Sequence, residues 1–359
     1  MKILHVITSL RTGGAEKLMV DLLPRLKEMG YQTDLLVFDG TETPFRRDIE
    51  DAGITVYDLG KGGSVYSPIK LLKLIPFLKK YDIVHTHNTA SQLFAAIGSI
   101  IYKSILCTTE HNTTNRRRNW KWYTRIDRWM YNRYQYIIAI SDQTKLHLKT
   151  YLRDLIPPIT TIPNGIDTSK YNSSSTIRLL PNMNNCTIKI MQVAGFRQQK
   201  DQDTTIKSLL FLPETYHLFL VGDGVRRKEL QDLVKDLNLI NRVHFLGIRT
   251  DVDKLLKSSD IVVMSSHWEG FGLSAVEGMA AGKPVIASDV DGLREVVKDA
   301  GLLFSPGNAN ELAERITELA CNKDYYKATT DACLKRASFF DISKMTEGYI
   351  EIYENISRI

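Results

Sequence analysis

Residues 261–277 read IVVMSSHWEGFGLSAVE. The stretch opens with an apolar run that predicts a buried strand over Ile261–Ser265. Gly270 and Gly272 interrupt the run, and a helix is expected to start near Phe271. A buried strand that passes through a glycine-containing loop into a helix is the repeating unit of α/β proteins with parallel sheets.

The same alternation of strand and helix occurs twice along the chain. In the first half, strands are predicted at 3–8, 34–38, 54–59, 82–87, 104–109 and 136–140, with a helix over Glu16–Met29. In the second half, strands are predicted at 189–194, 218–221, 243–246, 261–265, 285–288 and 302–304, with helices over 225–237, 310–321 and 342–356. Continuous apolar strands separated by helices indicate parallel sheets covered on both faces. The predicted fold class is therefore α/β, with two doubly wound, Rossmann-like domains facing a central cleft.

Composition fits a soluble globular protein of two domains. The 359 residues are 43% hydrophobic and 25% charged, which excludes a disordered chain, a collagen-like fibre and a disulfide-rich miniprotein. Residues 1–165 hold 23 basic and 15 acidic side chains, whereas the rest holds 24 and 26, so the first half attracts anions.

The four cysteines show no CxxC pairing, which argues against a disulfide framework or zinc site and for a reducing cytosol. The N-terminus reads as a strand rather than a signal peptide, and no apolar window approaches about 18 residues.

Three loops carry residues suited to a phosphorylated ligand. Thr12–Glu16 (TGGAE) places two glycines between the first strand and its helix, where free N–H groups accept an anion; a plain tight turn explains it equally well. Gly195–Lys200 (GFRQQK) offers Arg197 and Lys200 to a diphosphate, or is simply an exposed charged loop. In the third loop, the N–H groups of Phe271, Gly272 and Leu273 are expected to face the ligand, while Glu269 and Glu277 accept hydrogen bonds from hydroxyls.

The block EGFGLSAVEGMAAGKPVIASDVDG, with Glu269-x7-Glu277, resembles the signature of the retaining glycosyltransferases of family 4, which have the GT-B fold. The resemblance extends over nearly the whole chain through GGAEK, TEHN (109–112), IIAIS (137–141), IPNGID (162–167), VGDG (221–224) and the closing helix. It implies transfer of a sugar from a nucleotide donor, with a UDP-sugar expected, to an acceptor with retention and without a metal or other cofactor. It also implies an N-terminal acceptor domain over 1–167, completed by helix 342–359, and a donor domain over 168–341.

The resemblance assigns roles to particular residues. Gly14 contacts the donor phosphates or the acceptor, and His111 lies against the donor sugar. Arg197 and Lys200 neutralise the diphosphate, Glu269 holds sugar hydroxyls and Glu277 holds the ribose. The turn at Gly247, Ile248 and Arg249 is similar to the family's nucleobase site. One departure is that family members often carry the arginine directly after the small residue at the strand end, where this chain has Gly195; whether Arg197 reaches the same phosphate is left open.

The sequence also contains residues that could bind a metal. His85 and His87 are spaced like metal ligands, but the sequence offers no evident third ligand. Three DxD tripeptides occur, at 201–203, 251–253 and 289–291, and the last follows a predicted strand as in the metal-dependent GT-A fold. A GT-A enzyme would not show the second nucleotide-binding half, so we predict that no metal is bound. Gly222-x-Gly224 is similar to a dinucleotide fingerprint, but Arg227 replaces the third glycine.

The stretch Arg116–Arg133 (RRRNWKWYTRIDRWMYNR) has seven basic residues and one acidic residue, interleaved with tryptophan and tyrosine. Such a pattern suits an anionic membrane surface or a lipid pyrophosphate, or is a solvated helix with aromatic residues in the core. We predict acceptor or membrane contacts at Gly13, Arg116, Arg117, Arg118, Trp120 and Trp122. The expected partners are a nucleotide sugar and a lipid-linked glycan of cell-surface polysaccharide assembly, at the inner face of the plasma membrane, without nucleic acid. Two alternatives remain: a nucleotide-sugar epimerase of similar shape, and a non-enzymatic protein that binds anionic surfaces.

Overall fold

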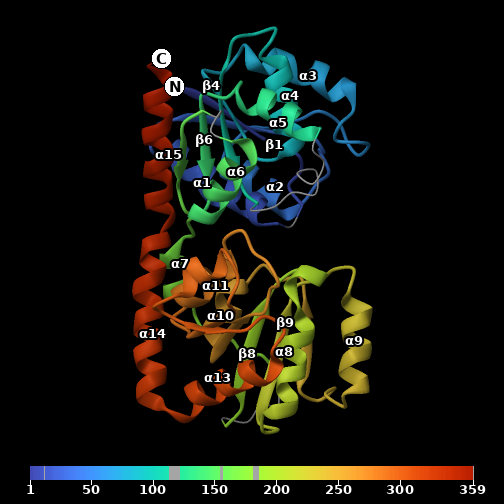
Figure 1. The fold of residues 1–359 in the computed structure, drawn as a ribbon, viewed down its shortest axis with the longest axis vertical. Helices are drawn as coiled ribbons and strands as arrows, with labels where there is room; N and C mark the ends of the chain where they lie inside the picture. Colours follow the sequence, from blue (N-terminus) through green and yellow to red (C-terminus); the bar gives the residue numbers. More distant parts are fainter. Residues whose placement is uncertain (12, 113–121, 154–156, 181–185, 359) are drawn as a thin grey trace. The chain divides into compact units, whose positions relative to one another are not determined.

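The computed structural model describes residues 1–11, 13–112, 122–153, 157–180 and 186–358. The chain divides into two compact units, residues 1–165 with 342–359 and residues 166–341 (Figure 1). Each unit is built on one parallel sheet with helices on its faces, as predicted. None of the helices among the described residues has both the length and the apolar character needed to cross a membrane.

Unit 1 holds a seven-stranded sheet of order β3-β2-β1-β4-β5-β6-β7. Its strands are β1 Lys2–Ile7, β2 Gln32–Val37, β3 Val56–Asp58, β4 Ile83–Thr86, β5 Ile105–Glu110, β6 Tyr136–Ala139 and β7 Ile159–Thr161. Its helices are α1 Gly14–Glu28, α2 Pro44–Asp51, α3 Pro68–Leu78, α4 Thr89–Gly98, α5 Tyr123–Tyr131, α6 Asp142–Leu152 and α15 Ile342–Ser357. The strand order reverses between β1 and β4, which is where doubly wound sheets open a crevice for ligands.

Unit 2 holds a six-stranded sheet of order β10-β9-β8-β11-β12-β13. Its strands are β8 Ile188–Val193, β9 Tyr216–Val221, β10 Val243–Gly247, β11 Ile261–Met264, β12 Val285–Ser288 and β13 Leu302–Phe304. Its helices are α7 Thr168–Ser173, α8 Gln202–Ser208, α9 Arg227–Asp236, α10 Val252–Ser258, α11 Leu273–Ala280, α12 Leu293–Val297, α13 Ala309–Cys321 and α14 Lys323–Ala337, with short 3-10 turns at Gln198–Lys200, Leu209–Phe211 and Ser338–Phe340. Here the order reverses between β8 and β11, the two strands that precede the Arg197 and Glu269 loops.

The last helix, α15, belongs to the core of unit 1 although it follows unit 2 in sequence. Its buried side chains include Met345, Tyr349 and Tyr353, which join the hydrophobic cluster built by β1 and α1. The hydroxyl of Tyr353 bonds His85 of β4 at 2.5 Å, and that of Tyr349 bonds Thr109 of β5 at 2.9 Å. The helix therefore supplies polar partners as well as apolar cover to one face of the sheet.

Two glycines of the VGDG sequence set the position of the loop that carries Arg197. A Cβ on Gly222 would lie 2.2 Å from the carbonyl oxygen of Ala194, and one on Gly224 would lie 2.5 Å from that of Phe196. The close approach allows Phe196 N–H to donate to the Asp223 carbonyl at 2.9 Å. These glycines therefore bring the loops after β8 and β9 into backbone contact, which is a structural reason for the motif.

Replacing Gly224 by alanine should consequently destabilise unit 2, because the new methyl group meets backbone atoms that cannot rotate away. Overpacking of this kind costs about 1–3 kcal/mol. The free energy of unfolding, measured by urea denaturation, should fall by that amount. Gly195→Ala is the matched control, because its Cβ would make only ordinary contacts, the nearest at 3.7 Å. Equal stability of the two variants would contradict the proposed role of the close approach.

Candidate functional site

The predicted diphosphate loop of unit 2 follows β8. Arg197 is exposed, and none of the described residues forms an ion pair or hydrogen bond with its guanidinium. Lys200 ends the 3-10 turn Gln198–Lys200, and its Nζ pairs with a carboxylate oxygen of Glu269, whose side chain is 15% exposed. Sequence reasoning placed both residues at the site but missed this ion pair. Arg197 is therefore the one of these two cations whose charge no carboxylate among the described residues neutralises.

The loop after β11 is held by backbone contacts with the loop after β8. His267 N–H donates to the Gln199 carbonyl at 2.8 Å, and Gln199 Nε2 donates to the Trp268 carbonyl at 2.8 Å. Beneath them, the Ser265 hydroxyl donates to the Asp201 carbonyl at 2.7 Å. The geometry of Lys200 and Glu269 is thus fixed by the elements on both sides of the switch point.

The helix predicted near Phe271 begins two residues later, at Leu273 of α11. Gly272 is the N-cap with φ of 96°, a conformation that favours glycine, and a Cβ there would lie 2.4 Å from Leu293. The Phe271 ring is buried edge-on against Phe340, with 5.3 Å between ring centroids. Phe271 therefore anchors the loop, and the N–H groups at the helix start carry no side-chain cap bond.

Glu277 lies inside α11 and is 8% exposed. Its Oε1 accepts a hydrogen bond of 2.7 Å from the hydroxyl of Tyr171 in α7. The sequence analysis did not include Tyr171 among the site residues, because a single tyrosine in a polar segment carries no periodic signal. Tyr171 fixes the rotamer of the carboxylate that the family resemblance assigns to the ribose.

The predicted nucleobase turn lies at the edge strand β10. Gly247 has φ of 69°, and its carbonyl accepts a hydrogen bond from Gly222 N–H at 2.8 Å. Ile248 is 67% exposed, and Arg249 pairs with Asp251 at 2.6 Å. The carbonyl of Gly247 is thus already engaged, which leaves the backbone of Ile248 and Arg249 as the exposed part of this turn.

In unit 1, the predicted residues lie after β1, which is one of the two strands at the switch point, and after β5. Gly13 is the N-cap of α1 and Gly14 its first residue, with no side-chain cap bond. His111 follows β5 and is half-buried. Its neighbour Glu110 is 6% exposed and accepts a 2.5 Å hydrogen bond from the Tyr131 hydroxyl.

The basic stretch predicted to contact acceptor or membrane is only partly described. Arg116, Arg117, Arg118 and Trp120 lie outside the described residues. Trp122 is 61% exposed, and Arg133 lies over the Trp129 ring at 5.5 Å. In α5, Asp127 and Tyr131 are buried, and Asp127 accepts a bond from Tyr151 at 2.9 Å, so this helix contributes one face to the core.

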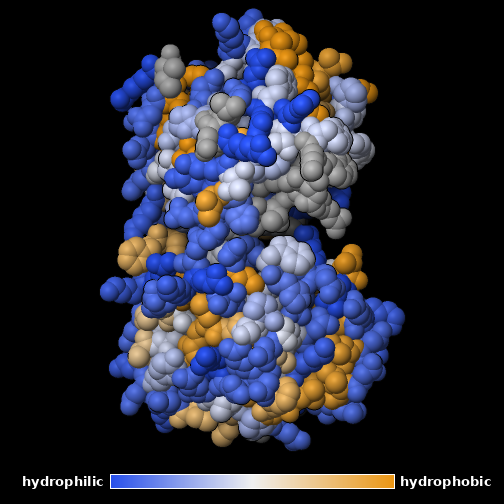
Figure 2. Space-filling view, in the orientation of Figure 1, coloured by the Kyte–Doolittle hydropathy of each residue, from blue (hydrophilic) through white to orange (hydrophobic). Residues whose placement is uncertain are grey.

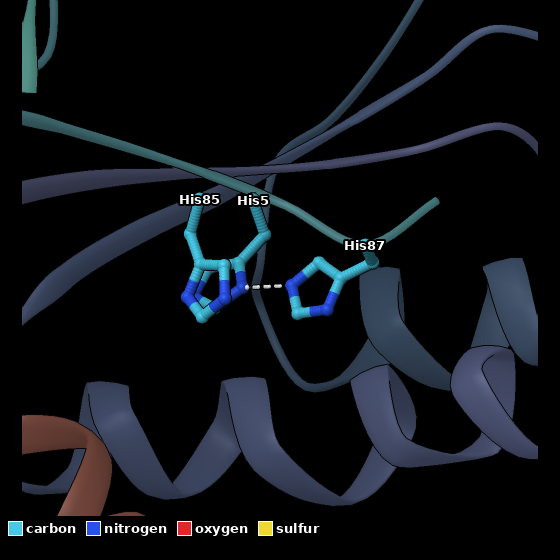
Figure 3. Close-up of side chains that lie close together, drawn as sticks. All are labelled: His5, His85 and His87. Carbon is cyan, nitrogen blue, oxygen red and sulfur yellow. Dashed lines mark hydrogen bonds between the residues drawn. The ribbon is translucent and has the colours of Figure 1, made fainter. Parts of the chain in front are cut away.

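Three buried histidines form a cluster that the sequence did not reveal as a set (Figure 3). His5 of β1 joins His85 and His87, because β1 and β4 pair with His5 opposite His85. The sequence had offered no third residue beside the HxH pair, since His5 lies 80 positions away. The three rings are nearly parallel, with interplanar angles of 12–26° and centroids 4.4–5.2 Å apart.

Hydrogen bonds already occupy most of the nitrogens in this cluster. His85 bonds the Tyr353 and Thr109 hydroxyls, and His87 bonds His5 at 2.9 Å and His111 at 3.1 Å. Among the nitrogens of His5, His85 and His87, only Nε2 of His5 has no hydrogen-bond partner in the described part of the chain. The three rings each place one nitrogen within 4.8 Å of the others, and a metal bound there would have to displace a hydrogen bond of both His85 and His87. Burial lowers the pKa of His5 to about 3 and of His111 to about 4, and holds that of His85 and His87 well below the usual value.

Two family models match the chain: "Glycosyltransferase Family 4" over residues 12–170 and "Glycosyl transferases group 1" over residues 181–335. An uncharacterized glycosyltransferase of Methanocaldococcus jannaschii, MJ1178, is 34% identical over 46% of this chain, and the match spans about half, 47%, of that relative's length. The UDP-Gal:alpha-D-GlcNAc-diphosphoundecaprenol alpha-1,3-galactosyltransferase of Escherichia coli is 25% identical over 81% of this chain and 78% of its own. The crystal structure of Anabaena Alr3699/HepE in complex with UDP and glucose superposes with a TM-score of 0.86 at 24% identity, covering 99% of this chain and 100% of that one.

The buried histidines should make the stability of unit 1 depend on pH. Their pKa values are lower in the folded chain than the ordinary value of 6.5, so below pH 6.5 the unfolded chain binds more protons. Unit 1 should therefore lose stability as the pH falls from about 6.5 to 4, by up to roughly 1.4 kcal/mol per pH unit for each histidine. Urea unfolding can be followed by tryptophan fluorescence in Trp268→Phe, because the other three tryptophans all lie in unit 1.

His5→Phe separates this effect from packing. The substitution should reduce the slope of stability against pH between pH 6.5 and 4, whatever its effect at pH 8. Below pH 4, carboxylates such as Asp39, whose pKa is lowered to about 2 mainly by the Gly62 N–H bond, begin to contribute as well. An unchanged slope in His5→Phe would show that His5 is not neutral in the folded protein.

The two family models together cover most of the chain, and the two doubly wound units match the architecture of the superposed structure. The chain therefore belongs to the glycosyltransferases of family 4, has the GT-B fold, and is a hexosyltransferase-type transferase.

Proposed function

We propose that the enzyme transfers a sugar from a UDP-sugar to a lipid-linked glycan acceptor, with retention of the anomeric configuration. The observation that carries the proposal is the arrangement of unpaired Arg197 beside the Lys200–Glu269 ion pair at the switch point of unit 2. Two cations suit a leaving diphosphate, and a carboxylate suits sugar hydroxyls. UDP is supported by the Anabaena structure, which is a complex with UDP and glucose, and by the E. coli galactosyltransferase, whose name gives UDP-Gal as its donor.

Within this proposal, Arg197 and Lys200 stabilise the negative charge that grows on the leaving diphosphate. Glu269 accepts hydrogen bonds from the sugar, and Glu277, oriented by Tyr171, accepts them from the ribose. The Lys200–Glu269 pair keeps the local charge balanced, so a carboxylate can sit near the phosphates without repelling them.

Retention is proposed to occur by attack on the face that the diphosphate leaves. Glu269 is paired with Lys200 and Glu277 is buried against Tyr171, so neither carboxylate suits the role of a covalent nucleophile. The acceptor oxygen forms its bond to the anomeric carbon as the bond to the diphosphate oxygen breaks. The acceptor proton passes to the departing phosphate.

We also propose that turnover requires no metal. In each of the three DxD tripeptides a carboxylate is held by an arginine: Asp203 by Arg226, Asp251 by Arg249, and Asp289 by Arg294. Arg197 and Lys200 can supply the positive charge that a metal would otherwise supply to the diphosphate. Both features support chemistry driven by side-chain charges.

A lipid-linked acceptor is supported by the surface of unit 1 that α3 and the end of α4 form. Its exposed apolar residues are Ile69, Leu72, Ile100 and Ile101, each at least 58% exposed, and Figure 2 shows hydrophobic residues gathered where Figure 1 labels α3 and α4. Residues 59–109 contain six lysines and one acidic residue, Asp82. Apolar side chains among lysines suit the interface of an anionic membrane, and peripheral association there would bring the enzyme to its acceptor. The diphosphoundecaprenol in the E. coli relative's name fits the same class of acceptor.

Lys200→Ala tests the charge assignment. Turnover of UDP-sugars, measured as UDP release in the presence of EDTA, should fall roughly 10²–10³-fold, with a smaller change in the Michaelis constant, since the charge develops in the transition state. Lys228→Ala is the control, because its pair with Asp232 is on the surface and Lys228 is 86% exposed. Unchanged turnover in Lys200→Ala would refute its role, and loss of wild-type activity in EDTA, restored by manganese, would refute the metal-free mechanism.

The membrane proposal predicts that the protein sediments with vesicles containing anionic lipid at low salt. Ile69→Glu with Leu72→Glu should release it, because two carboxylates replace apolar anchors on a basic surface. Val225→Glu with Ile240→Glu is the matched control on unit 2, where both side chains are exposed. Replacing Arg116, Arg117 and Arg118 by serine should weaken sedimentation by about 1 kcal/mol per cation that lies near the lipid. Donor hydrolysis should be unaffected, and a wild type that stays in the supernatant would point to a soluble acceptor.

A further inference from the structure

Three histidines of unit 1 form a single hydrogen-bonded chain that ends at the ligand-binding edge of the sheet. Nδ1 of His5 bonds Nε2 of His87 at 2.9 Å, and Nδ1 of His87 bonds Nε2 of His111 at 3.1 Å. Figure 3 shows the first of these bonds, with the His5 ring stacked over His85. His5 is fully buried in β1, whereas His111 is half-buried after β5. None of the described residues bonds Nδ1 of His111, so this nitrogen is available to a ligand.

The hydrogen-bonded chain of His5, His87 and His111 has only two self-consistent arrangements of protons. Each imidazole is neutral at pH 7, because burial lowers all three pKa values, and therefore carries one N–H. If His5 donates to His87, then His87 donates to His111, and His111 presents Nδ1–H outward. If the direction is reversed, His111 presents an unprotonated Nδ1, and His5 carries its proton on Nε2.

The unpartnered Nε2 of His5 distinguishes the two arrangements. In the first it is an unprotonated acceptor, and in the second it is an N–H donor buried without a partner. Orphaned buried donors are rarer than under-satisfied acceptors, and neither can be relieved here by water at a fully buried ring. The first arrangement is therefore the favoured one.

We propose that His5 and His87 are positioning residues that hold His111 as the Nδ1–H tautomer, so that a neutral imidazole donates a hydrogen bond to an oxygen of the donor sugar. The identity of this ligand rests on the proposed function; the tautomer follows from the chain of histidines alone. The hydrogen bond on one ring nitrogen decides which proton the other carries.

The neutrality of this donor suits the chemistry. A retaining transfer passes through an oxocarbenium-like state with positive charge on the sugar. A histidinium at this position would repel that charge, whereas a neutral Nδ1–H orients the sugar through a dipole. His5 and His87 thus orient the N–H group of His111 while remaining neutral, because burial strongly disfavours the protonation of either imidazole.

The tautomer can be measured directly in the wild type. Two-bond ¹H–¹⁵N correlation spectra of ¹⁵N-histidine-labelled protein at pH 7.5, with His111 assigned from the spectrum of His111→Gln, report which nitrogen carries the proton. We expect Nδ1 of His111 to be protonated and Nε2 unprotonated, and the same for His87. A protonated Nε2 on His111 would overturn the proposal.

Reversing the chain tests its functional consequence. In His5→Asp at pH 8 the carboxylate can only accept, so His87 should donate to it and His111 should switch to the Nε2–H tautomer. UDP-sugar turnover should fall about tenfold, the effect of one misdirected hydrogen bond, while UDP affinity stays unchanged. Tyr353→Phe is the matched control, because it removes a hydroxyl that bonds His85 outside the chain and should leave the His111 tautomer unaltered.

The outcomes separate the two proposals. A reversed tautomer with wild-type turnover would overturn the positioning role while leaving the proposed function intact. A wild type that turns over no sugar nucleotide would refute the proposed function, yet the wild-type spectrum would still decide the tautomer. If His5→Asp does not fold, the wild-type and Tyr353→Phe spectra retain the test of the chain's direction.

Discussion

Parallel pairing of the strands is the constraint on which the rest of each unit depends. In a parallel sheet the carboxyl ends of all strands lie at one edge. The reversal of strand order places two neighbouring loops at the middle of that edge. In unit 2 these are the loops of Lys200 and Glu269, which form an ion pair although 69 residues separate them. In unit 1 they are the loops after β1 and β4, where Asn88 accepts a hydrogen bond from Thr8 N–H at 3.0 Å.

The two sites use this edge with opposite electrostatics. Unit 2 exposes a guanidinium and balances an ammonium with a carboxylate, so it offers fixed charge to an anion. Unit 1 buries the imidazoles of His5, His85 and His87 in a stack, to which the half-buried His111 is hydrogen-bonded, and burial keeps them neutral, so it offers oriented dipoles instead. A diphosphate needs compensating charge, whereas a sugar needs directed hydrogen bonds, and under the proposed function the charges of unit 2 serve the first and the dipoles of unit 1 serve the second.

Most of the architecture could be predicted from the sequence, because buried parallel strands are short apolar runs that stand out between helices. The predicted strands β12 and β13 agree with the structure at both ends, but β7 was missed, since its three residues are only half-buried and carry no apolar run. The partners of the site residues were not predictable. His5 and Tyr171 meet His87 and Glu277 only through strand pairing and helix packing, and no short-range pattern encodes a contact across 82 or 106 residues.

Helix α15 follows unit 2 in the sequence but packs on unit 1, and its side chains explain how the histidine stack can stay buried. Neutral imidazoles are stable in a core only when their nitrogens find partners, and β1 and β4 alone would leave both nitrogens of His85 without donors or acceptors. Tyr353 of α15 supplies one hydroxyl directly, and Tyr349 bonds the Thr109 hydroxyl that supplies the other. The last helix of the chain therefore completes hydrogen bonding that the first half cannot complete by itself. The packing of α15 and the orientation of the histidines therefore depend on each other. Residues more than 200 positions away in the sequence help to determine which hydrogen bonds the histidines make at the strand ends.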